Sequence, residues 1–243
     1  GVTLESLNDN TGTIALLSSG GIDGGSGTVL MRAANYAFGG ADRTITTTGV
    51  LTIEPDADEN SFASSFDNQY LNPVSVTGLT LGKSSNASAI TLSRAISLSG
   101  PVSIYGGSID VNANITANSG NILLDADTGS TLNQSSTGIL LDDVITIETV
   151  TSGNLTLIGR SGDTGSGFDG IDASSANTTT LRSAGNLTLQ GYSYAASGSG
   201  RGVDLNNDVI AASGTVSMSG QHNTGATYAI SLSGSTSITA GTG

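Results

Sequence analysis

Apolar residues in this chain recur in pairs with one polar residue between them, and many of these pairs follow a glycine. The clearest copy is Gly185-Asn186-Leu187-Thr188-Leu189, where Leu187 and Leu189 share one side of an extended backbone. Alternation with a period of two residues predicts a β-strand that buries one face. Further copies begin at Gly12, Gly27, Gly49, Gly100, Gly120, Gly153 and Gly214. From Gly120 these glycines are 33, 32 and 29 residues apart, and this narrow range predicts a repeat architecture.

Each repeat holds two more short apolar segments. Between Gly100 and Ser119 the three pairs are Val102 and Ile104, Ile109 and Val111, and Ile115 and Ala117. In the repeats that begin at Gly153, Gly185 and Gly214, the second pair starts 16 to 18 residues after the glycine. Three short strands in one repeat describe a three-sided coil whose apolar residues face a shared axis. Because ordering the backbone costs about 1–2 kcal/mol per residue, one coil does not fold alone, and coils must stack through parallel strands.

The pattern therefore predicts an all-β fold, a parallel β-helix or three-faced solenoid, as a single segment over residues 1–243. Residues 54–73 break the repeat, and we expect them to form an inserted loop that projects from the stack. Loops on a rigid scaffold are where specificity tends to lie. The alternative all-β architecture is an antiparallel sandwich, which favours tight Asn-Gly or Asp-Gly hairpins. Such dipeptides are scarce in the chain, at Asp23-Gly24 and Asp169-Gly170.

Charge and composition narrow the range of partners. The formal net charge is −13 and Lys83 is the only lysine, which excludes nucleic acid and anionic lipid as primary partners. The chain has no run of about 18 apolar residues, so the sequence predicts no segment that inserts into a membrane. The chain has no cysteine, so disulfides are excluded. It begins at Gly1 without a signal-like segment, and we expect it to be a piece of a longer polypeptide.

The repeated unit resembles a known family of repeats. The segments that carry the resemblance are Gly185-Asn186-Leu187-Thr188-Leu189, Ser119-Gly120-Asn121-Ile122-Leu123-Leu124, Thr47-Thr48-Gly49-Val50-Leu51-Thr52-Ile53 and the run from Ile90 to Gly100. They are similar to the parallel β-helical repeats of filamentous haemagglutinin-like exoproteins, the large secreted bacterial adhesins of the two-partner secretion type. The resemblance covers most of the chain apart from 54–73.

This resemblance implies a right-handed parallel β-helix that serves as a structural or adhesive segment of a large secreted or cell-surface bacterial protein, an adhesin or surface filament. It implies an extracellular or cell-surface location and contact with a glycan or protein of a host or neighbouring cell. It brings no catalytic residue and no cofactor, so we expect no enzymatic activity. Unpaired strand edges at both ends of the stack also predict end-to-end self-stacking.

A carbohydrate-binding or carbohydrate-active β-helix, similar to polysaccharide lyases or hydrolases, is the alternative function. Such an enzyme needs carboxylates clustered on one strand face, with basic partners or Ca²⁺. The candidates are Asp56, Asp58, Glu59 and Asp67 in the span 54–73, and Asp142, Asp143, Asp163, Asp169 and Asp172 further along. They fall in different coils and corners, so we interpret them as solvated surface charge. Calcium binding by 54–73 is chemically feasible but unsupported, and no metal site is predicted.

Two tyrosines are the aromatic candidates for a binding site. Tyr192 and Tyr194 follow a strand at alternate positions, with Arg201 nearby in sequence. Aromatic rings on one side of a strand either stack on a sugar ring or cover the core at a corner. The candidate ligand-binding residues are thus Asp56, Asp58, Glu59, Asp67, Tyr192 and Tyr194. The sole histidine, His222, lies in the polar corner Gln221-His222-Asn223, where we expect it to be inert rather than part of a Ser-His-Asp triad.

Overall fold

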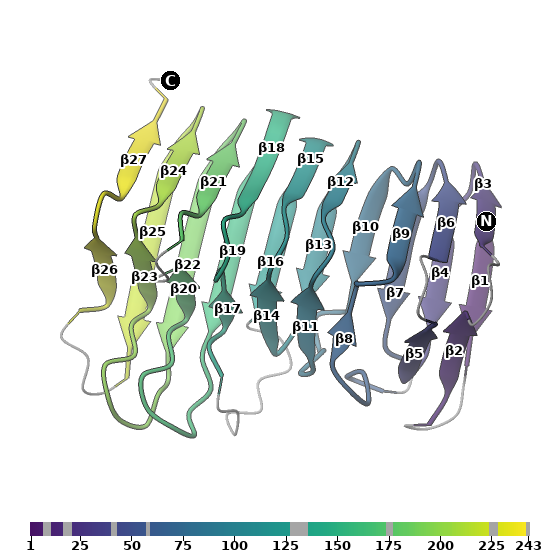
Figure 1. The fold of residues 1–243 in the computed structure, drawn as a ribbon, viewed down its shortest axis with the longest axis horizontal. Coiled ribbons are helices and arrows are strands. Elements are labelled where there is room, and N and C mark those ends of the chain that lie inside the picture. Colours follow the sequence, from purple (N-terminus) through teal and green to yellow (C-terminus); the bar gives the residue numbers. More distant parts are fainter. Residues whose placement is uncertain are drawn as a thin grey trace.

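The computed structural model of the chain describes residues 1–6, 11–16, 21–39, 43–56, 59–126, 136–173, 177–223 and 228–241. Within these ranges the chain forms 27 strands and no helix. The strands follow one another in groups of three, and with two exceptions each strand pairs in parallel with the strand three places further along (Figure 1). The all-β prediction is therefore confirmed. The long parallel sheets are consistent with a parallel β-helix or solenoid.

The three strands of each coil are named here by their first, second and third positions. The first position holds β1 (Val2–Glu5), β4 (Val29–Arg32), β7 (Val50–Glu54), β10 (Gly78–Leu81), β13 (Val102–Tyr105), β16 (Ile122–Ala126), β19 (Leu155–Arg160), β22 (Leu187–Ser193) and β25 (Val216–His222). The second holds β2 (Thr13–Leu16), β5 (Asn35–Phe38), β8 (Phe66–Asp67), β11 (Ala89–Leu92), β14 (Ser108–Val111), β17 (Ile139–Leu140), β20 (Ile171–Ala173), β23 (Val203–Asn206) and β26 (Ile230–Ser233). The third holds β3 (Ile22–Gly25), β6 (Arg43–Thr47), β9 (Leu71–Val74), β12 (Ile96–Leu98), β15 (Ile115–Ser119), β18 (Thr146–Ser152), β21 (Thr180–Ser183), β24 (Val209–Ala212) and β27 (Ser237–Ala240).

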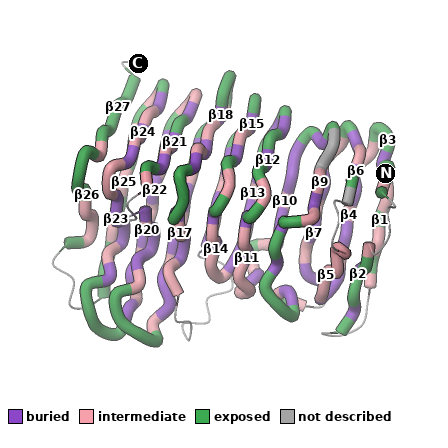
Figure 2. Tube along the Cα trace, viewed as in Figure 1, coloured by how far each residue is buried: buried purple, intermediate pink, exposed green. Residues whose placement is uncertain are grey.

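The core is a stack of aliphatic side chains from alternate strand positions. Leu155 and Leu157 on β19 pair in register with Leu187 and Leu189 on β22, and all four are fully buried. The three apolar pairs predicted between Gly100 and Ser119 lie in the core on β13, β14 and β15. Figure 2 shows the burial along the coils, with the connecting loops and the last strands exposed. Each buried aliphatic side chain contributes roughly 1.5–3 kcal/mol, so neighbouring coils stabilise one another.

The Gly-Asn dipeptide that opens the repeated unit links one coil to the next. Asn121 Oδ1 accepts the backbone N–H of Asn154 at 2.9 Å, and Asn154 Oδ1 accepts the backbone N–H of Asn186 at 2.8 Å. Asn186 Oδ1 continues this asparagine ladder by accepting the N–H of Thr215 at 3.0 Å. A Cβ on Gly185 would lie 2.5 Å from Asn154 Oδ1, so glycine leaves the space that the amide needs. The motif is thus a device for pairing coils in register.

Two sheets are interrupted, one between the second and third coils and one between the third and fourth. At the second position the β2–β5 pair is separate from the sheet that begins at β8, and at the third position β9 is separate from β12. Aromatic rings fill this region: Tyr36 packs edge-on against Phe62 and Phe66 with centroid distances of 5.7 Å, and the Tyr36 hydroxyl donates to the backbone oxygens of Met31 and Glu54 at 2.8 Å. Bulky rings here replace the aliphatic rungs found elsewhere.

The span 54–73, expected to project as an insertion, contains two strands of the stack. Within it β8 pairs with β11 and β9 pairs with β6. Phe62 and Phe66 are buried in the core. The parts of this span that lie outside strands are the connections 55–65 and 68–70. The sequence pattern obscures these strands because β8 is two residues long and because aromatic residues stand where the other coils have aliphatic pairs.

Candidate functional site

The longest connections join the first strand of a coil to the second, and they therefore lie along one corner of the stack. We call this corner the loop edge. Connections 82–88, 161–170 and 194–202 are fully described, and the last two project at the lower edge of Figure 1. Connections at the other corners are shorter, such as 153–154 before β19 and 207–208 before β24. Polar loops are thus gathered in one row on a rigid support.

Close backbone contacts hold these loops at their bases. Gly191 on β22 and Gly202 before β23 face each other, and a Cβ on Gly191 would lie 1.8 Å from the oxygen of Gly202. One coil earlier, a Cβ on Gly159 would lie 2.0 Å from the oxygen of Gly170. No side chain fits between these backbones, so glycine is required. Each loop starts and ends at such a contact, which restricts the positions of its two ends.

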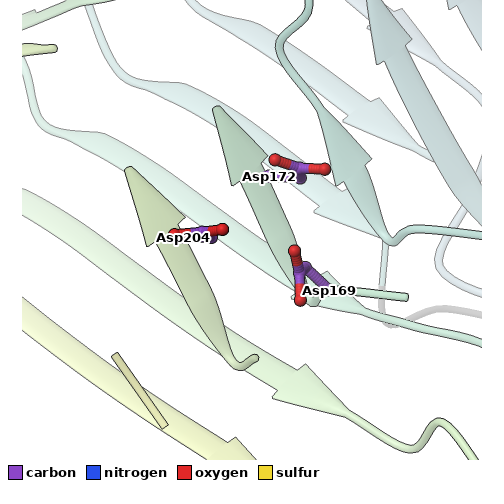
Figure 3. Close-up of side chains that lie close together, drawn as sticks. All are labelled: Asp169, Asp172 and Asp204. Atoms are coloured by element: carbon purple, nitrogen blue, oxygen red, sulfur yellow. The ribbon is translucent and has the colours of Figure 1, made fainter. Parts of the chain in front are cut away.

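Three aspartates lie close together where the loop edge joins the second strands of the coils. Asp172 on β20 pairs in register with Asp204 on β23, and Asp169 is the next-to-last residue of the 161–170 connection. One carboxylate oxygen of each lies within 4.8 Å of the others (Figure 3). Asp169 and Asp204 are only 5% and 3% exposed, whereas Asp172 is half-buried. This aspartate trio is the only group of three or more potential metal ligands within the described ranges.

Arg201 partly balances the trio. Its guanidinium donates to Asp204 Oδ2, and its backbone N–H donates to Asp169 Oδ1. Burial raises the pKa of Asp169 to about 7, and the hydrogen bond from the Arg201 N–H acts in the opposite direction by lowering it. The nearby charges of Asp172 and Asp204 raise this pKa further. Burial likewise raises the pKa of Asp208 to about 6, although the N–H groups of Thr179 and Asn206 donate to its oxygens at 2.9 Å.

The chemistry available to the trio is proton storage or partial ligation of a hard cation. Calcium takes six to eight oxygen ligands, and the trio offers three carboxylates, two of which already accept hydrogen bonds from Arg201. A glycosidase needs two carboxyl groups that reach the scissile bond. Because Asp169 and Asp204 are almost fully buried, only Asp172 has appreciable exposure to solvent.

The acidic residues proposed in the span 54–73 form no comparable group within the described residues. Asp56 is 2% exposed, and the Lys83 ammonium donates to the backbone oxygens of Asp56 and Glu59. Asp67 is exposed on β8 and accepts the N–H of Gln69 at 2.9 Å, a local turn contact. Asp58 lies outside the described residues. Lys83 thus binds this segment through the backbone oxygens of Asp56 and Glu59.

The two tyrosines do line a shared depression. Tyr192 and Tyr194 lie with Gln221, His222 and Asn223 around a cavity of about 120 Å³. The guanidinium carbon of Arg160 lies 4.5 Å from the centre of the Tyr194 ring, a cation–π contact. Arg201, which is near the two tyrosines in sequence, pairs with Asp204. One face of Tyr194 is therefore already covered by the protein.

Asp204 and Arg160 are the site residues that the sequence analysis did not select. Asp169 and Asp172, expected to be spread over different corners with the other acids, lie together with Asp204. The sequence carries a signal for this contact, because Ile171-Asp172-Ala173 and Val203-Asp204-Leu205 occupy the same position within successive repeats. Equal phase in a stack of parallel coils places two residues side by side.

Comparisons with known proteins identify no relative. No family model matches the chain, and no curated protein or solved structure matches it either. Among the described residues, no helix is long and apolar enough to cross a membrane.

Proposed function

We propose that the chain is a structural and adhesive segment of a large secreted or cell-surface bacterial protein, similar to the filamentous haemagglutinin-like exoproteins, and that it has no catalytic activity. The observation that carries this proposal is the nine-stranded parallel sheet at the first position, which runs in register from β1 to β25. A sheet continuous through every coil makes a stiff rod, because bending it would break several strand pairs at once.

We further propose that the winding is right-handed. Each coil returns a strand to the same sheet through a crossover, and crossovers between parallel strands are right-handed in about 98% of cases because of strand twist. The asparagine ladder supports a rod of fixed register, since Asn121, Asn154 and Asn186 each bind the following coil.

The loop edge is the surface proposed to contact a glycan or protein on a host or neighbouring cell. Its loops vary in sequence and length while the strands beneath them repeat. Binding residues favour loops held by a rigid scaffold. The net charge of −13 favours partners that are neutral or basic.

Adhesion to cells and to immobilised glycans and matrix proteins tests this role. Replacing residues 195–200 by Gly-Gly shortens one loop towards the two-residue connection 106–107 already tolerated at this corner. The shortened chain should keep its β-sheet circular dichroism and lose binding. A matched control replaces residues 234–236, at the corner before β27, by Gly-Gly. Absence of binding by the unaltered chain to every cell type and surface would refute the adhesive role.

Carbohydrate recognition is the second candidate, favoured by the Tyr192 and Tyr194 depression with Arg160 beside it. Binding fits this geometry better than turnover, because Asp169 and Asp204 of the trio are buried away from any substrate. Release of reducing ends from polysaccharide by the purified chain, lost in Asp172→Asn, would favour an enzyme.

A further inference from the structure

One sheet of the stack carries almost no charge. The third-position strands β12, β15, β18, β21, β24 and β27 form a six-stranded sheet (Figure 1), and we call its outer surface the third face. Glu148 and Arg182 are the only charged residues in these six strands. The second-position strands from β8 to β23, by contrast, contain four aspartates. In a chain of net charge −13, the third face is therefore where a second copy meets little repulsion.

A depression of about 300 Å³ lies on the third face, across β18, β21 and β24. Its lining includes Val150, which is 50% exposed, and the small residues Ala184 and Ala211. All of its lining residues belong to the described part of the chain. Low charge together with exposed apolar side chains is typical of the core of a protein interface. The valine is an apolar knob beside a hollow lined by alanines.

The two charged residues of the third face have no ion-pair partner. Glu148 on β18 and Arg182 on β21 are register partners, and both line the depression. Neither forms an ion pair with the other or with any further residue of the described ranges. Arg182 is exposed and Glu148 is half-buried. Both charges are therefore available to groups of opposite sign on a partner.

A two-fold axis parallel to the strands, midway between β18 and β21, makes this surface complementary to itself. The axis leaves three strands of the sheet on each side, so the sheets of two copies overlap while their stacks run in opposite directions. Glu148 of each copy then faces Arg182 of the other. Val150 and Ala184 each lie two residues beyond this pair, so Val150 of each copy faces Ala184 of the other. The rotation also keeps the strand directions aligned, as in most sheets that pack face to face.

We propose that the third face binds a second copy of the chain as an antiparallel pair, held by two Glu148–Arg182 ion pairs beside two Val150 side chains. Six strands about 4.8 Å apart and about 15 Å long present about 400 Å² per copy, which is the size of a weak, reversible interface. This pairing goes beyond the proposed adhesive role and does not depend on it. It lays two rods side by side, whereas exposed strand edges would join them end to end.

Charge reversal tests the ion pairs. Sedimentation velocity up to millimolar concentration, in chains that carry Ile238→Lys to block end-to-end association, should show one discrete dimer. Arg182→Glu and Glu148→Arg each place like charges opposite one another, and each should raise the dissociation constant at least about tenfold. An equal mixture of these two variants should pair again, because each variant then faces opposite charges. Asp67→Arg on β8 makes the same change of charge as Glu148→Arg on another sheet and should leave pairing intact.

Introduced cysteines test the orientation, since the chain has none of its own. Ser97 on β12 and Thr239 on β27 lie in the row of register partners that contains Glu148 and Arg182. The rotation therefore places Ser97 of one copy opposite Thr239 of the other. Oxidation of a mixture of Ser97→Cys and Thr239→Cys chains should give a disulfide-linked dimer on non-reducing electrophoresis. Ser97→Cys alone should give little, because its two copies lie five strand spacings, about 24 Å, apart.

Melting temperatures matched to the unaltered chain show that each variant folds. A chain that stays monomeric at every concentration overturns the proposal, as does undiminished pairing of the Arg182→Glu variant. A mixture of the two charge-reversed variants that fails to pair also overturns it. Cross-linking of the mixed cysteine variants that is no faster than that of Ser97→Cys alone excludes the antiparallel arrangement.

Discussion

Asn154 takes part in two interactions between coils. Its N–H donates to Asn121 Oδ1 below it, and its own side chain accepts from Asn186 above it. Asn154→Ala leaves the Asn186 N–H without this acceptor and should lower the free energy of unfolding by about 0.5–1.5 kcal/mol. Urea denaturation measures the change. Asn118→Ala makes the same chemical change at an exposed residue outside the ladder and should be neutral; equal losses in both variants would contradict the role of the ladder.

The buried aspartates give the fold a defined pH response. The pKa values of Asp169 and Asp208 are raised in the folded state to about 7 and about 6, from 3.8. At a pH below the pKa of the unfolded state, the protonated carboxyl groups therefore stabilise the fold in full. This stabilisation is lost as the pH rises towards 7. We expect the melting temperature to fall between pH 5 and pH 8.

Asp169→Asn should flatten that fall, because an amide does not ionise. Differential scanning calorimetry at both pH values measures the slope. Asp142→Asn removes one exposed charge and is the control for the general effect of the net charge. A slope that Asp169→Asn leaves unchanged would show that burial of this carboxylate has no effect on stability.

At the scale of the strand, the glycine contact between β22 and the 194–202 connection fixes where that loop begins and ends. A Cβ on Gly191 would meet the Gly202 oxygen at 1.8 Å. Gly191→Ala should therefore separate the two backbones and cost about 1–3 kcal/mol of stability. Thermal unfolding measures the loss. Ser199→Thr adds a methyl group at an exposed position of the same loop and should have little effect; a stable Gly191→Ala variant would mean that the contact readily opens.

The sequence alone predicted which residues form strands better than it predicted which residues of neighbouring coils contact one another. Alternating pairs such as Leu187 and Leu189 mark strand and core directly, because burial on one face imposes the two-residue period. Contacts between coils depend instead on the number of residues at each corner, which among the fully described connections varies from the two of 106–107 to the ten of 161–170. The aspartate trio arises from such contacts, and local pattern carries little information about it.

At the scale of the whole molecule, the two ends of the stack differ from its middle. Strands β25, β26 and β27 each lie at the end of a sheet, as do β1 and β3 at the opposite end. Leu232 and Ile238 in the last coil are 50% and 44% exposed. Unpaired edges with apolar side chains are templates for further strands.

We expect copies of the chain to associate end to end as concentration rises. Sedimentation velocity over a wide concentration range should show growing assemblies, and Ile238→Lys should suppress them by placing charge on the β27 edge. A lysine at exposed Val144, away from the ends, is the control. A chain that remains monomeric at every concentration would exclude this association.

The asparagine ladder has a consequence for how such a chain changes over generations. Since each Gly-Asn unit recognises only the coil beside it, a duplicated block of about thirty codons arrives with both of its interfaces already made. Every such duplication would lengthen the stack by one coil, roughly 4.8 Å, and leave its existing surfaces unaltered.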